Sequence, residues 1–136
     1  MNRRTLLAGA LAAGMSAAIP ASAHHSFAMF DQTKIITLEG VVREFQWTNP
    51  HAFIELSVRD NGQLRVWSIE LNSPNNLRRQ GWRRNSLHQG DRITLRANPL
   101  RDGHTGGLFL DLEKEDGTML DSGLPKDGTP INVPSV

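Results

Sequence analysis

The sequence predicts a mainly β domain, and three observations carry this prediction. Apolar and polar residues alternate with a period of two through most of the chain, which is typical of half-buried strands. Gly-containing turns separate these stretches, and only one later segment has helix start and stop signals. The predicted order is three strands, a short helix and two or three more strands. This order favours a small OB-like barrel of five to six strands; a small open β-sandwich is the alternative.

The first and longest predicted strand, residues 34–47, changes its apolar face part-way along. Its large apolar residues fall into two groups on opposite faces: Ile36 and Leu38, then Val41, Phe45 and Trp47. The change falls at Gly40, so we expect a bend or bulge there that carries the strand round the barrel. One long bent strand closes a small barrel efficiently, which favours the barrel over the sandwich.

The other predicted elements follow in order. Asn61-Gly62 is a strong hairpin signal between the second and third strands. Ser73 as N-cap, Pro74 in the first turn and Gly81 at the end delimit the short helix. Strands are expected at residues 53–59, 64–71, 91–97, 107–113 and 118–120. One face of the strand at 107–113 is expected to hold three leucines: Leu108, Leu110 and Leu112.

The first twenty-three residues have the three parts of a cleavable signal peptide. Arg3 and Arg4 give a positive start, residues 6–19 form an apolar run, and Ala21-Ser22-Ala23 supplies small residues for cleavage. The run is shorter than the ~20 residues that span a bilayer, so no membrane span is expected. We therefore predict export to the periplasm by a Sec or twin-arginine signal, with cleavage after Ala23.

Cleavage would leave 113 of the 136 residues, enough for one domain and too few for two. We expect an N-terminal arm at residues 24–33, the barrel at residues 34–120 and a flexible C-terminal tail at residues 121–136. The tail is rich in Pro and Gly and has few large apolar groups.

Composition argues against several classes of function. Removing the leader changes the balance from 15 Lys plus Arg against 14 Asp plus Glu to 13 against 14, a net charge of −1. A near-neutral domain has no global field for nucleic acid, so no nucleic-acid partner is expected. The sequence has no Cys, which excludes disulfides and thiolate metal sites. It also has no Tyr, no Gly-x-Ser-x-Gly motif and no Gly-rich phosphate loop, so an enzyme is not the favoured class.

The histidines are the residues that point to a chemistry. Cleavage after Ala23 would give His24 a free amine beside its imidazole, and these two nitrogens together suit copper or another divalent transition metal. His25 is a neighbouring candidate ligand. The alternative is that both histidines are a polar chain end with no ligand.

Two loop histidines are candidates to complete such a site. His51 lies in Trp47-Thr48-Asn49-Pro50-His51, between the first two predicted strands, and His104 lies in the loop at residues 101–106. In an OB barrel those two loops are expected at one mouth, where such barrels bind ligands. Met29 on the arm is a soft donor suited to copper. Hydrogen bonding to the backbone is the alternative role for His51, and surface exposure the alternative for His104 and His88.

Three further residues are candidate ligand-binding residues: Trp47, Asn49 and Trp82. Trp82 lies among four arginines, which in principle can meet phosphates while the ring stacks on a base or sugar. The alternative, which we favour, is the solvated face of a short helix with one aromatic anchor beneath it. We expect acidic residues to neutralise this face: Glu70, Asp91 and the segment 111–116.

Several short motifs resemble a family of small exported bacterial proteins that is catalogued only as a domain of unknown function. These motifs are His24-His25-Ser26-Phe27, Leu38-Glu39-Gly40-Val41-Val42, Phe45-Gln46-Trp47-Thr48-Asn49-Pro50-His51, Ser73-Pro74, Gly81-Trp82 and Gly90-Asp91. The resemblance extends to about Leu120 and implies export and a role for the His-His start and the Asn-Pro-His turn. It implies no activity or ligand. In that family a His often stands where this chain has Asn98, and a His at position 104 is not general.

Three functions are therefore in competition. The first is an exported periplasmic protein of unknown physiological role that binds a divalent metal, such as copper, through His24 and a loop histidine. The second is an envelope interaction protein without metal or catalysis. The third is a small copper-dependent oxidative enzyme, for which the chain offers few aromatic residues on a substrate-facing surface.

Overall fold

The computed structural model describes residues 27–123, and it shows a mainly β domain with one short α-helix. A 3₁₀ turn, η1, covers Phe27–Met29, and α1 covers Pro74–Arg79. The six strands are β1 (Ile36–Gln46), β2 (Phe53–Asp60), β3 (Gln63–Glu70), β4 (Arg92–Pro99), β5 (Gly106–Lys114) and β6 (Met119–Asp121). The predicted tail therefore begins within β6, and residues 124–136 lie outside the described residues, as does the predicted signal peptide. The one α-helix in the described part is far too short to cross a membrane.

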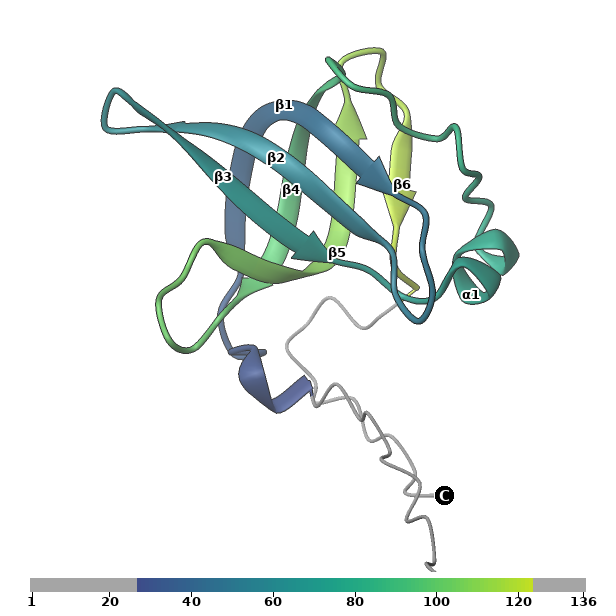
Figure 1. Cartoon of the computed structure of the whole chain (residues 1–136), viewed down its shortest axis with the longest axis horizontal. Helices are drawn as coiled ribbons and strands as arrows, with labels where there is room; N and C mark the ends of the chain where they lie inside the picture. The colour runs from purple at the N-terminus through teal and green to yellow at the C-terminus, as the bar shows by residue number, and fades with distance from the viewer. Residues whose placement is uncertain (1–26, 124–136) are drawn as a thin grey trace, which may run out of the picture.

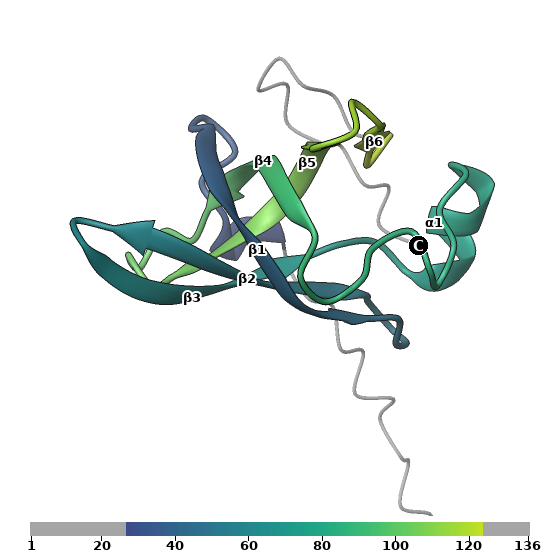
Figure 2. The same ribbon diagram turned by 90° about the horizontal axis from the view of Figure 1, so that it is seen from above.

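Five of the strands close into a barrel (Figures 1 and 2). β1 pairs with both β2 and β4, β2 pairs with β3, and β4 pairs with β5, all antiparallel. A parallel pairing of β3 with β5 closes the ring, and β6 adds to the far end of β5. With α1 between β3 and β4, this is the OB-like barrel that the sequence predicts, and the open sandwich is excluded.

The predicted bend at Gly40 is confirmed. Gly40 faces Val58 of β2 and Ile93 of β4, so it stands where β1 passes from one neighbour to the other. A Cβ at this position would lie 2.4 Å from the carbonyl oxygen of Ser57, which only glycine avoids. The bend therefore depends on the missing side chain.

The predicted change of inward face is displaced from Gly40 to a bulge three residues later. Arg43 is the extra residue between Val42 and Glu44 where β1 faces β2. Because the bulge shifts the alternation, Leu38 and Val42 belong to the core before it, and Trp47 after it. Val41 was therefore predicted on the wrong face.

A second bulge changes the predicted pattern of β5. Arg96 faces Asp111 whereas Ala97 faces Phe109, which leaves Leu110 as the extra residue. Phe109 and Leu112 consequently join the main core cluster, while Leu108 and Leu110 are buried outside it. The prediction that the three leucines share one face is therefore wrong.

The turn and helix signals are confirmed. Asn61 and Gly62 both have positive φ, 47° and 79°, and connect Asp60 directly to Gln63 across the hairpin. The hydroxyl oxygen of Ser73 accepts a hydrogen bond from the backbone N–H of Asn76 at 3.3 Å, as an N-cap does. Leu77 and Trp82, both 0% exposed, anchor α1 and the turn after it in the core.

Candidate functional site

His51 is positioned by the base of the β2–β3 hairpin. Backbone hydrogen bonds join Ala52 to Asn72 (3.1 Å) and to Leu71 (2.9 Å), so the strand pairing continues into the loop before β2. Thr48 Oγ1 also donates to the carbonyl oxygen of His51 at 2.9 Å. The backbone of His51 is thus fixed on both sides.

The ring of His51 contacts the carboxylate of Glu70. Its Nδ1 and Glu70 Oε1 form a short hydrogen bond, with the side chains 24% and 11% exposed. Glu70 is the last residue of β3 and faces Phe53, two positions after His51. Both side chains therefore lie on the same side of the hairpin.

A carboxylate bound at Nδ1 determines what the imidazole does chemically. When Nδ1–H donates to Glu70, the ring is held in the tautomer whose lone pair is on Nε2. The same partnership orients most metal-binding histidines in proteins and raises their basicity. The pair is therefore suited to hold a metal through Nε2.

His104 has a different environment. Its side chain is 80% exposed, and its Nδ1 lies 3.0 Å from Asp102 Oδ2, another exposed group. The backbone N–H of His104 donates to Asp102 Oδ1, and this bond, followed by the contact with the His104 ring, lowers the pKa of Asp102. The pair caps a surface turn, which agrees with the alternative role considered for His104.

The structure does not bring His51 and His104 together. The His104 loop is tied to β3 at Val66, whose carbonyl oxygen accepts from Thr105 Oγ1 at 2.8 Å. The His51 loop is tied at Asn72, six residues further along the chain. The two loops are therefore attached at different points of the β2–β3 hairpin, and within residues 27–123 no three His, Cys, Asp or Glu residues gather closely enough to hold a metal.

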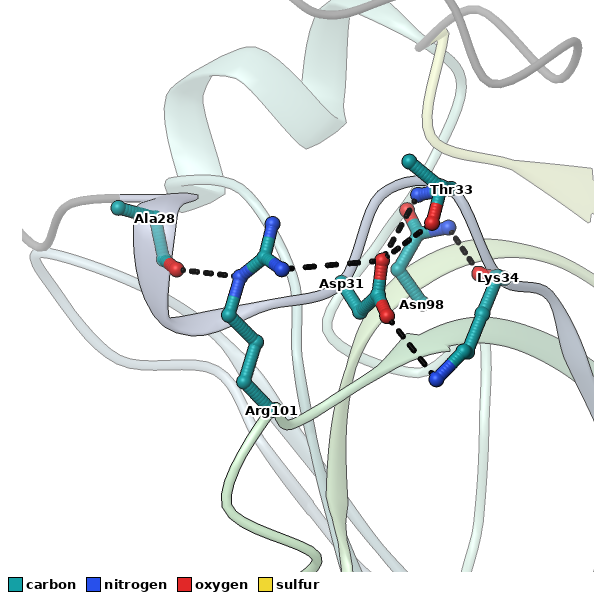
Figure 3. Close-up of polar contacts among 6 residues, drawn as sticks. All are labelled: Ala28, Asp31, Thr33, Lys34, Asn98 and Arg101. Carbon is teal, nitrogen blue, oxygen red and sulfur yellow. Dashed lines mark hydrogen bonds and ion pairs between the residues drawn. The ribbon is translucent and has the colours of Figure 1, made fainter.

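His24 and His25 lie outside the described residues, but the arm that follows them is firmly held (Figure 3). Arg101 donates from its backbone N–H to Met29 and from Nε to Ala28, both at 3.0 Å. Further on, Asn98 Nδ2 donates to the carbonyl oxygen of Lys34 at 2.7 Å. Residues 28–34 are therefore held against β4 and the loop after it, and in sequence only His25 and Ser26 separate His24 from η1.

Asp31 is the central acceptor of the arm (Figure 3). Its carboxylate accepts from the hydroxyl of Thr33 at 2.6 Å and pairs with Lys34 at 3.3 Å and with Arg101 at 3.9 Å. The hydrogen bond from the Thr33 hydroxyl, followed by that from Lys34, lowers the pKa of Asp31. This cluster holds the arm on the end of β4.

The predicted ligand-binding aromatics are core residues. Trp82 is 0% exposed, donates from Nε1 to the carbonyl oxygen of Asp121 at 2.9 Å and packs edge-on against Phe109. Trp47 is also buried, and the Arg78 guanidinium lies 5.7 Å from its ring centroid. Trp82 is therefore unable to stack on a base or sugar. Asn49 is exposed in the loop, beside a cis peptide bond to Pro50.

Glu70 is the residue of the candidate site that the sequence reasoning did not assign to it. It was predicted to neutralise the arginines near Trp82, whereas it pairs with His51. The Asn-Gly turn contained the missing signal, because counting strand pairs outward from that turn places Glu70 opposite Phe53. In that register Glu70 lies diagonally opposite His51, on the same face of the hairpin.

Comparison with known proteins gives a family and no activity. The family of unknown function DUF6152 matches residues 13–111. The chain belongs to this family. The match begins inside the predicted signal peptide and ends in β5. Among curated proteins none matches the chain.

A solved structure with a similar fold is the mitochondrial single-stranded DNA-binding protein Rim1 of S. cerevisiae. The two share 12% sequence identity with a TM-score of 0.47, and the alignment covers 61% of this chain and 94% of the yeast chain. The assignment of the barrel does not depend on this likeness, because the strand pairings alone close the ring.

Proposed function

We propose that the mature protein is an exported periplasmic binding protein that holds one divalent transition metal, with copper preferred, between His24 and His51. The observation that carries this proposal is the partly buried hydrogen bond between His51 Nδ1 and Glu70. It gives His51 the partly buried carboxylate partner that metal-binding histidines use.

His24 supplies the other half of the proposed site. After cleavage behind Ala23, its amine and imidazole form a two-nitrogen chelate, a donor set that suits Cu(II). The arm restricts where this chelate can lie, because three residues extend at most about 10 Å from the fixed residue Phe27. Because the arm is tied to Arg101 after β4, a metal shared with His51 requires His24 to reach from there towards the β2–β3 hairpin.

His51 is preferred to His104 as the loop ligand for two reasons. The His51 ring is partly buried and its carboxylate partner is nearly buried, whereas the His104 pair is open to water on both sides. A buried partner holds the ring in one orientation, which reduces the entropy that metal binding would otherwise cost. His104 is nevertheless close in sequence to Arg101, which touches the arm, so it is the alternative loop ligand that the experiment must distinguish.

The test is a calorimetric titration of Cu(II) into protein that begins at His24. We expect binding of one equivalent, and a strong loss of affinity when the amine of His24 is acetylated, because the amine then becomes an amide. His51→Ala should weaken binding as well. His104→Ala is the matched control and should leave the affinity unchanged.

Three results would contradict the proposal. Equal weak binding with a free and with an acetylated His24 amine would remove the amino-terminal chelate. Normal binding by His51→Ala together with a loss in His104→Ala would move the site to the other loop. If the processed protein binds none of Cu(II), Ni(II) and Zn(II), the metal site is refuted and the alternative of an envelope interaction protein that binds no metal is favoured.

A further inference from the structure

Four exposed arginines surround the end of α1. Arg78 and Arg79 close the helix, and Arg83 and Arg84 follow within the next five residues. Between them Trp82 is fully buried, so the backbone of this segment is fixed to the core. The structure thus presents four cationic side chains outward from a rigid base, and we name residues 78–84 the arginine surface.

The arginine surface is not neutralised by the carboxylates that the sequence suggested. Glu70 pairs with His51, Asp91 with Lys114 (3.7 Å), and Asp111 with Arg96 (2.5 Å). Across residues 27–123, the ion pairs include none of the four arginines of the surface. Within these described residues no carboxylate therefore pairs with the surface, which concentrates four positive charges on a domain whose predicted mature net charge is −1.

The surface lies on a projecting part of the molecule. In both views α1 is at the edge of the domain, outside the barrel wall and near β6 (Figures 1 and 2). A groove lies elsewhere, across β1 and its neighbours, and is lined by Gly40, Ser57 and Arg92 among others. A projecting cationic helix end can contact a broad flat surface, whereas a nucleic-acid strand is usually bound inside a groove.

The buried aromatics argue against single-stranded nucleic acid as the partner. Proteins that bind single strands combine cationic grooves with exposed aromatic rings on which bases stack. Here Trp82 is 0% exposed and Trp47 is 6% exposed, with Arg78 over its ring. Guanidinium groups without a stacking platform suit phosphate, which they bind through two parallel hydrogen bonds.

We propose that the arginine surface docks the protein on anionic phospholipid headgroups at a membrane face. This inference rests on four neighbouring arginines that form no ion pair within residues 27–123 and lie on a projecting segment anchored in the core. The inference is independent of the metal site. A basic residue near an anionic bilayer contributes about a fivefold gain in binding, so the surface as a whole is sufficient for reversible attachment.

The test is co-sedimentation of the mature protein with phosphatidylcholine vesicles containing about one-third phosphatidylglycerol, against vesicles of phosphatidylcholine alone. Arg79→Gln/Arg84→Gln is the informative variant, because both side chains are exposed and neither forms an ion pair within residues 27–123, so the fold should be unchanged. Arg59→Gln/Arg65→Gln on the β2–β3 hairpin is the control of equal charge. Thermal melts verify that both variants fold.

We expect the wild type to bind the anionic vesicles at low salt and to dissociate at high salt. Arg79→Gln/Arg84→Gln should bind about 25-fold more weakly, whereas the hairpin control should change less than about threefold. Equal losses in the two variants, or no binding to anionic vesicles, would overturn the proposal. Tighter binding to a single-stranded oligonucleotide than to the vesicles would also overturn it and make nucleic acid the partner.

Discussion

Gly40→Ala tests the account of how the barrel closes. The added methyl group would lie 2.4 Å from the carbonyl oxygen of Ser57 and 2.9 Å from Leu56 Cγ. Real Cβ contacts are essentially never shorter than 3.0 Å, and the obstructing oxygen belongs to the backbone of the paired strand. β1 and β2 must therefore separate at the point where β1 turns from β4 to β2.

The expected cost follows from that geometry. Forcing a methyl group into a packed site costs about 1–3 kcal/mol when side chains can adjust, and a backbone obstacle places this case at the upper end. At ~4–8 °C per kcal/mol, a loss of about 3 kcal/mol lowers Tm by roughly 12–24 °C.

Urea unfolding and differential scanning calorimetry measure this loss. Gly62→Asn is the matched control, because no atom lies within 4 Å of the added Cβ and Asn tolerates the positive φ of 79°. We expect the control to stay within about 1 kcal/mol of wild type. A Gly40→Ala protein as stable as the control would refute the close approach of β1 and β2 at the bend.

Three further predictions concern the packing around the barrel. Trp82→Phe removes the hydrogen bond to Asp121 and leaves a cavity, so it should cost about 2–3 kcal/mol and speed amide exchange in β6; unchanged exchange would contradict the docking of β6 by this indole. Asp31→Asn should speed exchange in the arm at neutral pH. Because the pKa of Asp31 is lowered in the fold, its stabilisation is present above the ordinary carboxyl pKa and disappears as pH falls through the lowered value. The exchange rates of variant and wild type should therefore converge in acid. A difference that persists in acid would show that the ionised carboxylate is not what holds the arm. Thr105→Val should cost about 1 kcal/mol and loosen the His104 loop in exchange experiments, and no change would show that the anchor to β3 contributes nothing.

Local signals in the sequence were sufficient for the architecture. The period of two located the strands, Asn61-Gly62 set the hairpin, and Ser73 with Pro74 started the helix, because each depends on a few adjacent residues. Gly40 was recognisable because a glycine inside a long strand marks a bend or a close approach.

The details that failed depend on pairing between distant segments. The bulges at Arg43 and Leu110 reverse the alternation in β1 and β5, and a bulge is decided by how two strands fit together. The ion-pair partners of the acidic residues also depend on tertiary packing, whereas the burial of Trp82 agrees with the favoured interpretation of this residue as an aromatic anchor. For the candidate site, the sequence identified His51, but its partner Glu70 required the hairpin register.

In the proposed metal site, His51, oriented by Glu70, holds a metal together with the amino terminus of the mature chain. Paramagnetic broadening by substoichiometric Cu(II) locates the metal in the ¹⁵N–¹H spectrum of protein that begins at His24. We predict that the amides of Ala52 and Glu70 broaden first, and that Glu70→Gln weakens Cu(II) binding by about 10–100-fold. Broadening centred on Gly103 and Thr105, or even broadening over the whole surface, would contradict the claim.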